Sequence, residues 1–188
     1  LKTLDIKQIQ NASSTYNYDN INALHKTLVH TSMNSRVYVF TNYGNFFSIP
    51  VRDIPNSKFV TKGTALSEIA HTETKEKVVG LFAEQDFEEN TELIFCTQDG
   101  FIKRSPASEY AVLKTGSVAL KLKDFDRVVS VQINDNLPSI LMVSSDGMAV
   151  NVEYKTVPVT KRASGGVIGM NLNDNEKVIF ASQVNTLD

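Results

Sequence analysis

A short apolar run returns at a constant interval along this chain of 188 residues. Its first apolar residue falls at Leu28, Val78, Val128 and Val178, so the step is 50 residues each time. Each run is strand-like, β-branched and flanked by charge. A period of this length indicates repeated units whose apolar faces are buried only when neighbouring units stack.

The second repeated feature is a β-hairpin, clearest at residues 93–106 (LIFCTQDGFIKRSP). Two apolar runs flank the Gln98-Asp99-Gly100 step, which predicts a tight turn because Gly accepts the positive φ that such a turn requires. Residues 37–49 and 140–152 repeat the pattern of an apolar run, a Thr or Ser, a Gly and a second run. The hairpin is therefore predicted to be the core of each unit.

A strand led by glycine precedes the apolar runs. Segments that begin at Gly116 and Gly166 align at the same step of 50, and a looser copy begins at Gly63 with three extra residues before Val78. Between hairpin and glycine lies a polar crossover, Arg-Asp-Ile-Pro at 52–55 and Lys-Thr-Val-Pro at 155–158, which Ala-Ser-Glu-Tyr replaces at 107–110.

Four short strands in every ~40 to 50 residues are typical of a propeller blade. We therefore predict an all-β, propeller-like disc of four-stranded blades. The full units span about residues 36–81, 92–131 and 139–181, and residues 1–35 hold a partial unit. If C-terminal strands complete that partial unit and close the ring, a single domain over 1–188 has about four blades.

Composition excludes several classes of protein. The 19 Lys and Arg against 21 Asp and Glu give a net charge of −2, so a nucleic-acid partner would need a local basic face. The one cysteine, Cys96, excludes an internal disulfide framework and a cysteine-based zinc site, and is expected to be a small buried hydrophobe.

Neither a signal peptide nor a run of ~20 apolar residues is visible, which favours a cytoplasmic protein. A start at Leu1 without Met suggests an excised fragment.

No catalytic, cofactor or metal site is predicted. His25, His30 and His71 lack metal-ligand spacing. The Gly-rich residues 165–169 resemble a nucleotide loop, but no helix pattern follows them. One functional alternative is a propeller enzyme with a site in its central channel. It would need a repeated acidic position at the strand starts, and the sequence offers none that would line such a channel.

Three of the repeated motifs together resemble a known family. They are TQDGFIKRSP at 97–106, DFDRVVSV at 124–131 and KRASGGVIGMNL at 161–172. They are similar to the C-terminal β-pinwheel domain of the A subunits of type IIA DNA topoisomerases. The resemblance implies a disc of blades joined by strand exchange, with duplex DNA bent around a basic rim. It also implies partners in the remainder of that polypeptide and in the B subunit, a nucleoid-associated location in the cytoplasm, and catalysis in other domains.

Within that family, gyrase carries a glutamine, two arginines and a glycine-rich run before a Gly-Val strand. Here the corresponding residues 161–167 read KRASGGV, which keeps the basic residues and the Gly-Val start but lacks the Gln and the full Gly run. The chain therefore resembles the topoisomerase IV branch of the family more closely than the gyrase branch.

Lys103 and Arg104 are the first candidates for contact with DNA. They follow the Gly100 turn on a strand, so alternation sends them to opposite faces. One or both could neutralise a phosphate. The alternative is a solvated edge pair that discourages aggregation between strands.

Basic residues just ahead of each unit's glycine form a second set: Lys62, Lys114, Lys161 and Arg162. A loop led by glycine lets backbone amides approach a phosphate that a nearby cation anchors. The alternative is that these are ordinary loop lysines beside a turn glycine. Further candidates are Arg52 and Lys155 in the crossovers, and Lys121, Lys123 and Arg127, expected on one exposed strand pair.

The hypothesis from sequence is a non-catalytic domain that binds the backbone of duplex DNA along a curved outer edge. Its main alternative is a propeller that binds proteins, for which mixed surface charge is unremarkable.

Overall fold

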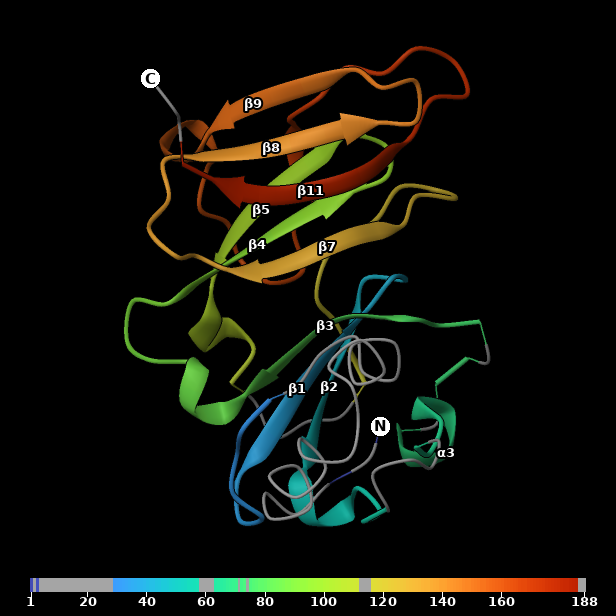
Figure 1. The fold of residues 1–188 in the computed structure, drawn as a ribbon, viewed down its shortest axis with the longest axis vertical. Coiled ribbons are helices and arrows are strands. Elements are labelled where there is room, and N and C mark those ends of the chain that lie inside the picture. Colours follow the sequence, from blue (N-terminus) through green and yellow to red (C-terminus); the bar gives the residue numbers. More distant parts are fainter. Residues whose placement is uncertain are drawn as a thin grey trace, which may run out of the picture.

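The computed structural model of the chain describes residues 1, 3, 29–57, 63–70, 72–73, 75–111 and 116–185. They form three antiparallel sheets (Figure 1). The first sheet has the order β3 (Val78–Ala83), β1 (Arg36–Thr41), β2 (Asn45–Pro50), β6 (Ser117–Val118). The second has the order β10 (Val167–Ile168), β5 (Phe101–Pro106), β4 (Glu92–Thr97), β7 (Val128–Ile133), and the third the order β11 (Val178–Val184), β8 (Ser139–Ser144), β9 (Ala149–Glu153). The predicted all-β fold of bladed sheets is confirmed.

Neighbouring units exchange a strand. The strand led by Gly116, β6, pairs with β2 of the preceding hairpin, and the strand led by Gly166, β10, pairs in the same way with β5. The third sheet has three strands among the described residues, with β9 at its edge. The fourth strand of the first and second sheets is therefore supplied by the next unit along the chain.

The exchanged strand is fixed at one atom of the preceding hairpin turn. The carbonyl oxygen of Gly44 accepts the N–H groups of Ala119 and Leu120 at 2.7 and 3.1 Å. The carbonyl oxygen of Gly100 likewise accepts those of Gly169 and Met170, at 2.8 and 3.1 Å. This approach needs glycine, because a Cβ at Gly100 (φ +85°) would lie 2.2 Å from the Met170 carbonyl oxygen.

The first residues of the chain occupy the place of such a hairpin strand. Leu1 and Thr64 exchange two backbone hydrogen bonds of 2.6 and 2.7 Å, and Thr3 forms a parallel bridge to Asn56. Ile102 pairs with Val167, and Arg104 bridges Val159, in the same arrangement. Leu1 and Thr3 of the partial unit thus correspond to Ile102 and Arg104.

The expected completion of the partial unit by C-terminal strands is not observed within the described residues, where β11 pairs with β8 of its own sheet. Most of residues 1–35 lie outside them, so the number of blades stays a prediction.

The segment after Gly63 differs from its two counterparts. The counterparts form strands directly after the glycine, at Ser117–Val118 and Val167–Ile168, and continue as loops. Here Leu66–Ala70 forms the helix α3 where they have the loop. Good helix formers (Ala, Leu and Glu) fill this stretch, and Leu66 buries its side chain in the apolar cluster on the outer face of the first sheet. The three extra residues of this copy lengthen the connection to β3, which accommodates the helix.

The core lies between the sheets. Alternate residues of β4 point to opposite faces: Leu93 and Phe95 pack against the first sheet, and Ile94 and Cys96 against the third. Cys96 is fully buried, as predicted, and burial raises the pKa of its thiol to about 12. The middle sheet is therefore covered on both faces.

A single 3-10 turn follows each hairpin: η1 (Val51–Asp53), η3 (Ala107–Glu109) and η4 (Tyr154–Thr156). The crossover is thus common to all three units, although the middle copy has a different sequence. A further 3-10 turn, η2 (Glu84–Asp86), follows β3.

Two glycines of similar conformation test the exchange. Gly100→Ala is expected to destabilise more than Gly147→Ala, because Gly147 (φ +81°) has nothing within 4 Å of its Cβ position. The left-handed conformation costs each variant about 1 kcal/mol, and the clash with the exchanged segment adds roughly 1 to 3 kcal/mol in Gly100→Ala. Urea unfolding measures both, and equal losses would contradict the proposed need for close approach at Gly100.

Candidate nucleic-acid interface

Lys103 does not reach the surface. Its side chain is 1% exposed, and its ammonium lies 5.4 Å from the centre of the Phe95 ring. It donates hydrogen bonds to the carbonyl oxygens of Ala119 (3.1 Å), Ser164 (3.4 Å) and Arg162. The prediction of a phosphate contact at Lys103 is wrong in this structure, and so is the alternative of a solvated edge residue.

The strand register explains what is unusual about this lysine. Lys103 faces Phe95 across the β4–β5 pair, where the other hairpins place Phe47 and Val150. A cation therefore stands where the neighbouring units have an apolar side chain. Burial lowers the pKa of Lys103 from 10.5 to about 8.

Arg104 points to the opposite face, as alternation predicted, and is also engaged. Its Nε donates to the Val157 carbonyl oxygen at 2.7 Å, and its Nη1 lies 3.3 Å from the carboxylate of Glu92. Its guanidinium lies 4.2 Å from the centre of the Tyr154 ring. Arg104 thus ties the second sheet to the third and is not presented to a ligand, which corrects the second prediction at this hairpin.

The loop at 161–166 is closed on itself. The N–H and hydroxyl of Ser164 donate to the Lys161 carbonyl oxygen at 3.2 and 2.6 Å. Lys161 is exposed, whereas Arg162 is half-buried, with its guanidinium 5.3 Å from the centre of the Phe46 ring and its N–H donating to Glu109. The loop thus presents Lys161 outward and holds Arg162 partly inside.

Lys121 and Lys123 lie beside this loop. The N–H of Lys121 donates to the Ser164 carbonyl oxygen at 3.3 Å, and both lysines line a cleft with Gly165 and Gly166. Both are exposed, and the Lys123 ammonium lies 4.3 Å from the centre of the Phe101 ring. The expected strand pair is not formed, because these lysines lie in the loop between β6 and β7.

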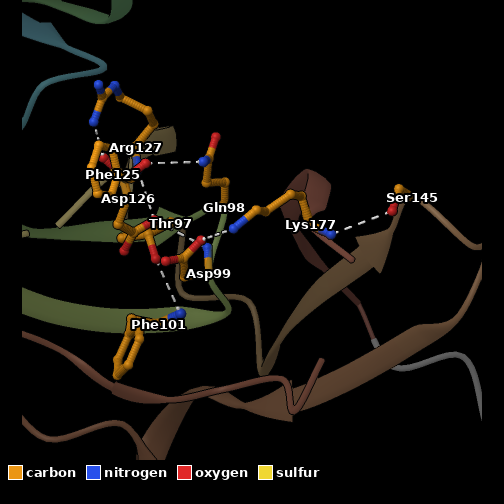
Figure 2. Close-up of polar contacts among 9 residues, drawn as sticks. All are labelled: Thr97, Gln98, Asp99, Phe101, Phe125, Asp126, Arg127, Ser145 and Lys177. Atoms are coloured by element: carbon orange, nitrogen blue, oxygen red, sulfur yellow. Dashed lines mark hydrogen bonds and ion pairs between the residues drawn. The ribbon is translucent and has the colours of Figure 1, made fainter. Parts of the chain in front are cut away.

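Arg127 is half-buried just before β7. Its guanidinium lies 4.4 Å from the centre of the Tyr43 ring and donates to the carbonyl oxygen of Asp126 at 2.6 Å. Figure 2 shows Arg127 and Lys177 around the Gln98-Asp99 turn, where Lys177 pairs with the Asp99 carboxylate at 2.6 Å. These cations connect neighbouring units at the turn end of the hairpins.

An acidic residue that recurs in all three units was missed by the prediction from sequence. Glu76, Asp126 and Glu176 recur at a step of 50, two residues before β3, β7 and β11, so the expectation that no acidic position repeats at the strand starts was wrong. The carboxylate of Asp126 is buried and accepts the N–H groups of Asp99 and Arg127 at 3.0 and 2.7 Å (Figure 2). Burial raises the pKa of Asp126.

These acids bind their own hairpin or turn. Glu76 accepts the Thr41 hydroxyl at 3.1 Å and the Asn45 amide at 2.6 Å, and Glu176 accepts the N–H and side-chain amide of Asn173. Among the described residues, no three His, Cys, Asp or Glu side chains are grouped so as to hold a metal ion.

The remaining candidates lie elsewhere. Arg52 and Lys155 are exposed in η1 and η4, at the ends of the hairpins opposite their turns, and Arg52 has its Nε 3.9 Å from the Asp53 carboxylate. Lys62 and Lys114 lie outside the described residues. The structure therefore places Lys121 and Lys123 in one cleft, beside the loop that carries Lys161 and Arg162.

The cleft and the exchanged strands can be compared with known proteins. The family described as DNA gyrase C-terminal domain, beta-propeller, matches residues 35–83, 91–135 and 138–185. The chain belongs to this family. Among curated relatives, the A subunit of DNA topoisomerase 4 from Staphylococcus epidermidis is 29% identical over 167 residues, which cover 87% of this chain and 21% of that protein. The A subunit of DNA gyrase from Dehalogenimonas lykanthroporepellens is 31% identical over 144 residues, 76% of this chain and 18% of that protein.

Solved structures support the same fold. The C-terminal domain of DNA topoisomerase IV superposes with a TM-score of 0.84 at 20% identity over 98% of this chain and 58% of that one. The DNA gyrase A C-terminal domain gives a TM-score of 0.62 at 21% identity over 81% of this chain and 49% of that one. The match to the curated relatives spans about a fifth of their length.

Lys103 gives the unfolding free energy a distinctive pH dependence. Between about pH 8 and 10.5 the unfolded chain binds a proton that the folded chain has released, so stability from this group rises with pH across that window and is lost again as pH falls to 8. The unfolding free energy of the wild type minus that of Lys103→Met is therefore expected to increase from about pH 8 to 10.5 in urea titrations. Lys121→Met, at an exposed lysine, is the control, and a flat difference for Lys103→Met would contradict the burial of its charge.

Phe125, in the loop before β7, offers a test of backbone strain. It has φ 65° and is 88% exposed, and its counterpart Asn175 has φ 67°. Asn tolerates this conformation better than Phe, so Phe125→Asn is expected to raise the unfolding free energy by about 0.5 to 1 kcal/mol. Asn175→Phe should lower it by a similar amount. A loss of stability in Phe125→Asn would show that the ring makes a stabilising contact.

Proposed function

We propose that this chain is the DNA-binding part of the A subunit of a type IIA topoisomerase, of the topoisomerase IV kind, and that it binds the backbone of duplex DNA without catalysing a reaction. The remainder of that polypeptide and the B subunit are its proposed protein partners, in the nucleoid of the cytoplasm. No cofactor is part of this proposal.

One observation carries the proposal: strand exchange places two loops from different units against each other. Lys121 and Lys123 follow β6, while Lys161 and Gly165 precede β10, and the Lys121 N–H to Ser164 carbonyl bond joins the two. Exposed lysines beside a glycine-containing loop suit phosphate groups, which carry no sequence information. The binding would therefore be independent of DNA sequence.

The family supports this proposal at a coarser level, since relatives are A subunits of DNA topoisomerase 4 and DNA gyrase. The topoisomerase IV kind is favoured because residues 161–167 lack the glutamine and the full glycine run of gyrase. Bending a site of ~20 to 30 base pairs costs of order 1 to 6 kcal/mol. Several phosphate contacts are thus needed for the domain to present bent DNA to the rest of the enzyme.

A salt series of duplex binding tests the proposal. Lys121→Ala with Lys123→Ala is expected to weaken binding and to reduce the slope of log affinity against log salt by roughly 1 to 2 units, because each lost phosphate contact removes about 0.9. The control pair Arg52→Ala with Lys155→Ala removes the same charge at the other end of the hairpins and should leave the slope close to that of the wild type.

Two outcomes would contradict the proposal. A wild-type slope near zero, or no binding at low salt, would favour a propeller that binds proteins. An equal loss of slope in both double variants would show that the cleft is not the site and that only net charge matters.

A further inference from the structure

The loop at 161–166 is held from the inside by a buried cation. Lys103 donates to the carbonyl oxygens of Arg162 and Ser164, so both carbonyls point toward its ammonium. The Ser164 carbonyl oxygen also accepts the N–H of Lys121. Two peptide groups of one loop are therefore oriented by the same atom.

Peptide planarity fixes where the corresponding N–H groups point. The structure contains no cis peptide bond among its described residues, and in a trans peptide the N–H lies opposite the carbonyl. The N–H of Ala163 shares a peptide with the Arg162 carbonyl, and the N–H of Gly165 shares one with the Ser164 carbonyl. Both N–H groups are therefore directed away from Lys103.

These two N–H groups have no acceptor within the described part of the chain. Ala163 and Gly165 are both accessible to solvent, so an external acceptor can reach them. A Cβ placed on Gly165 would lie 3.7 Å from the Lys121 carbonyl oxygen, which puts this residue beside the exposed Lys121. The N–H of Ser164, which lies between them, donates to the Lys161 carbonyl oxygen inside the loop. Two outward N–H groups from one loop, next to a lysine, can together bind an anion.

We propose that Lys103 is a positioning residue whose ammonium turns the N–H groups of Ala163 and Gly165 outward, and that these groups and Lys121 bind one DNA phosphate. The inference rests on the proposed function and deepens it, because it names a subsite within the interface. Lys103 itself touches no DNA. Its charge polarises the two peptides, which strengthens the hydrogen bonds that their N–H groups donate.

The surroundings of Lys103 keep this arrangement specific to the middle hairpin. Three ionisable groups face its ammonium: Glu109, Arg162 and Tyr110, whose hydroxyl donates to the same Ala119 carbonyl oxygen at 3.2 Å. The positions of Phe47 and Val150 in the other hairpins hold side chains that cannot donate to a loop carbonyl. The subsite is therefore expected once in the described chain.

The first experiment uses the wild-type domain and NMR. A short duplex of mixed sequence is added, and the backbone N–H signals of Ala163 and Gly165 are followed. Both signals are expected to shift downfield as duplex is added. The affinity fitted to their shifts should equal the affinity of the complex as a whole. If signals of Lys121 and Lys123 move while these two stay in place, the lysines bind DNA alone and the inference is overturned.

The second experiment uses Lys103→Met, which keeps length and volume but removes the charge and all three donated bonds. Because the other hairpins carry apolar residues here, the fold is expected to persist, and unchanged shifts in β8 and β9 verify it. Duplex affinity should fall about tenfold, as expected for lost hydrogen bonds to a charged group, while the salt slope changes by less than about 0.5 because every surface cation remains.

The outcomes separate this inference from the proposed function. Unchanged affinity in Lys103→Met, together with the loss seen in Lys121→Ala with Lys123→Ala, overturns the subsite and keeps the DNA interface. Absence of salt-dependent binding in the wild type overturns both. A further readout is pH: wild-type affinity should fall from about pH 7 to 9.5 as Lys103 loses its proton, and Lys103→Met should not show this fall.

Discussion

The structure depends on one contact, in which the carbonyl oxygen of a turn glycine accepts two N–H groups from the next unit. Gly44 does this for Ala119 and Leu120, and Gly100 does it for Gly169 and Met170. A β-hairpin alone is marginally stable in water, so each of these two blades relies on the unit that follows it. The same contact brings the loop before β10 against the loop after β6, and the proposed DNA interface follows directly from it.

The repeat and the hairpins could be predicted because they rest on local rules. Apolar alternation, the glycine turns and the step of 50 residues specify strands and their order without knowledge of neighbours. The helix after Gly63 could not be predicted from the repeat, since alignment to Gly116 and Gly166 favoured a strand. There, local helix propensity and the burial of Leu66 decided the outcome.

The site was harder to predict because the charge of a residue does not determine whether its side chain is exposed or buried. Lys103 and Arg104 stand out in the sequence, and alternation correctly sent them to opposite faces, but both faces of the middle sheet are covered. A lysine on a sheet buried on both sides must find internal acceptors, and Lys103 finds three carbonyls. The repeated acids at Glu76, Asp126 and Glu176 were visible at the same step of 50 and would have predicted hydrogen bonds to their own hairpin or turn.

The balance of charge explains why backbone N–H groups matter in this protein. Lys103 and Arg104 are engaged inside, and so is Arg36, whose guanidinium donates to the Ser48 hydroxyl and carbonyl at 2.6 and 2.7 Å. These three cations are therefore not available to phosphate, in a chain whose net charge is −2. An internal lysine that directs peptide N–H groups outward adds phosphate donors without adding surface charge. In that arrangement the buried cation and the exposed Lys121 act on the same phosphate from opposite sides of one loop.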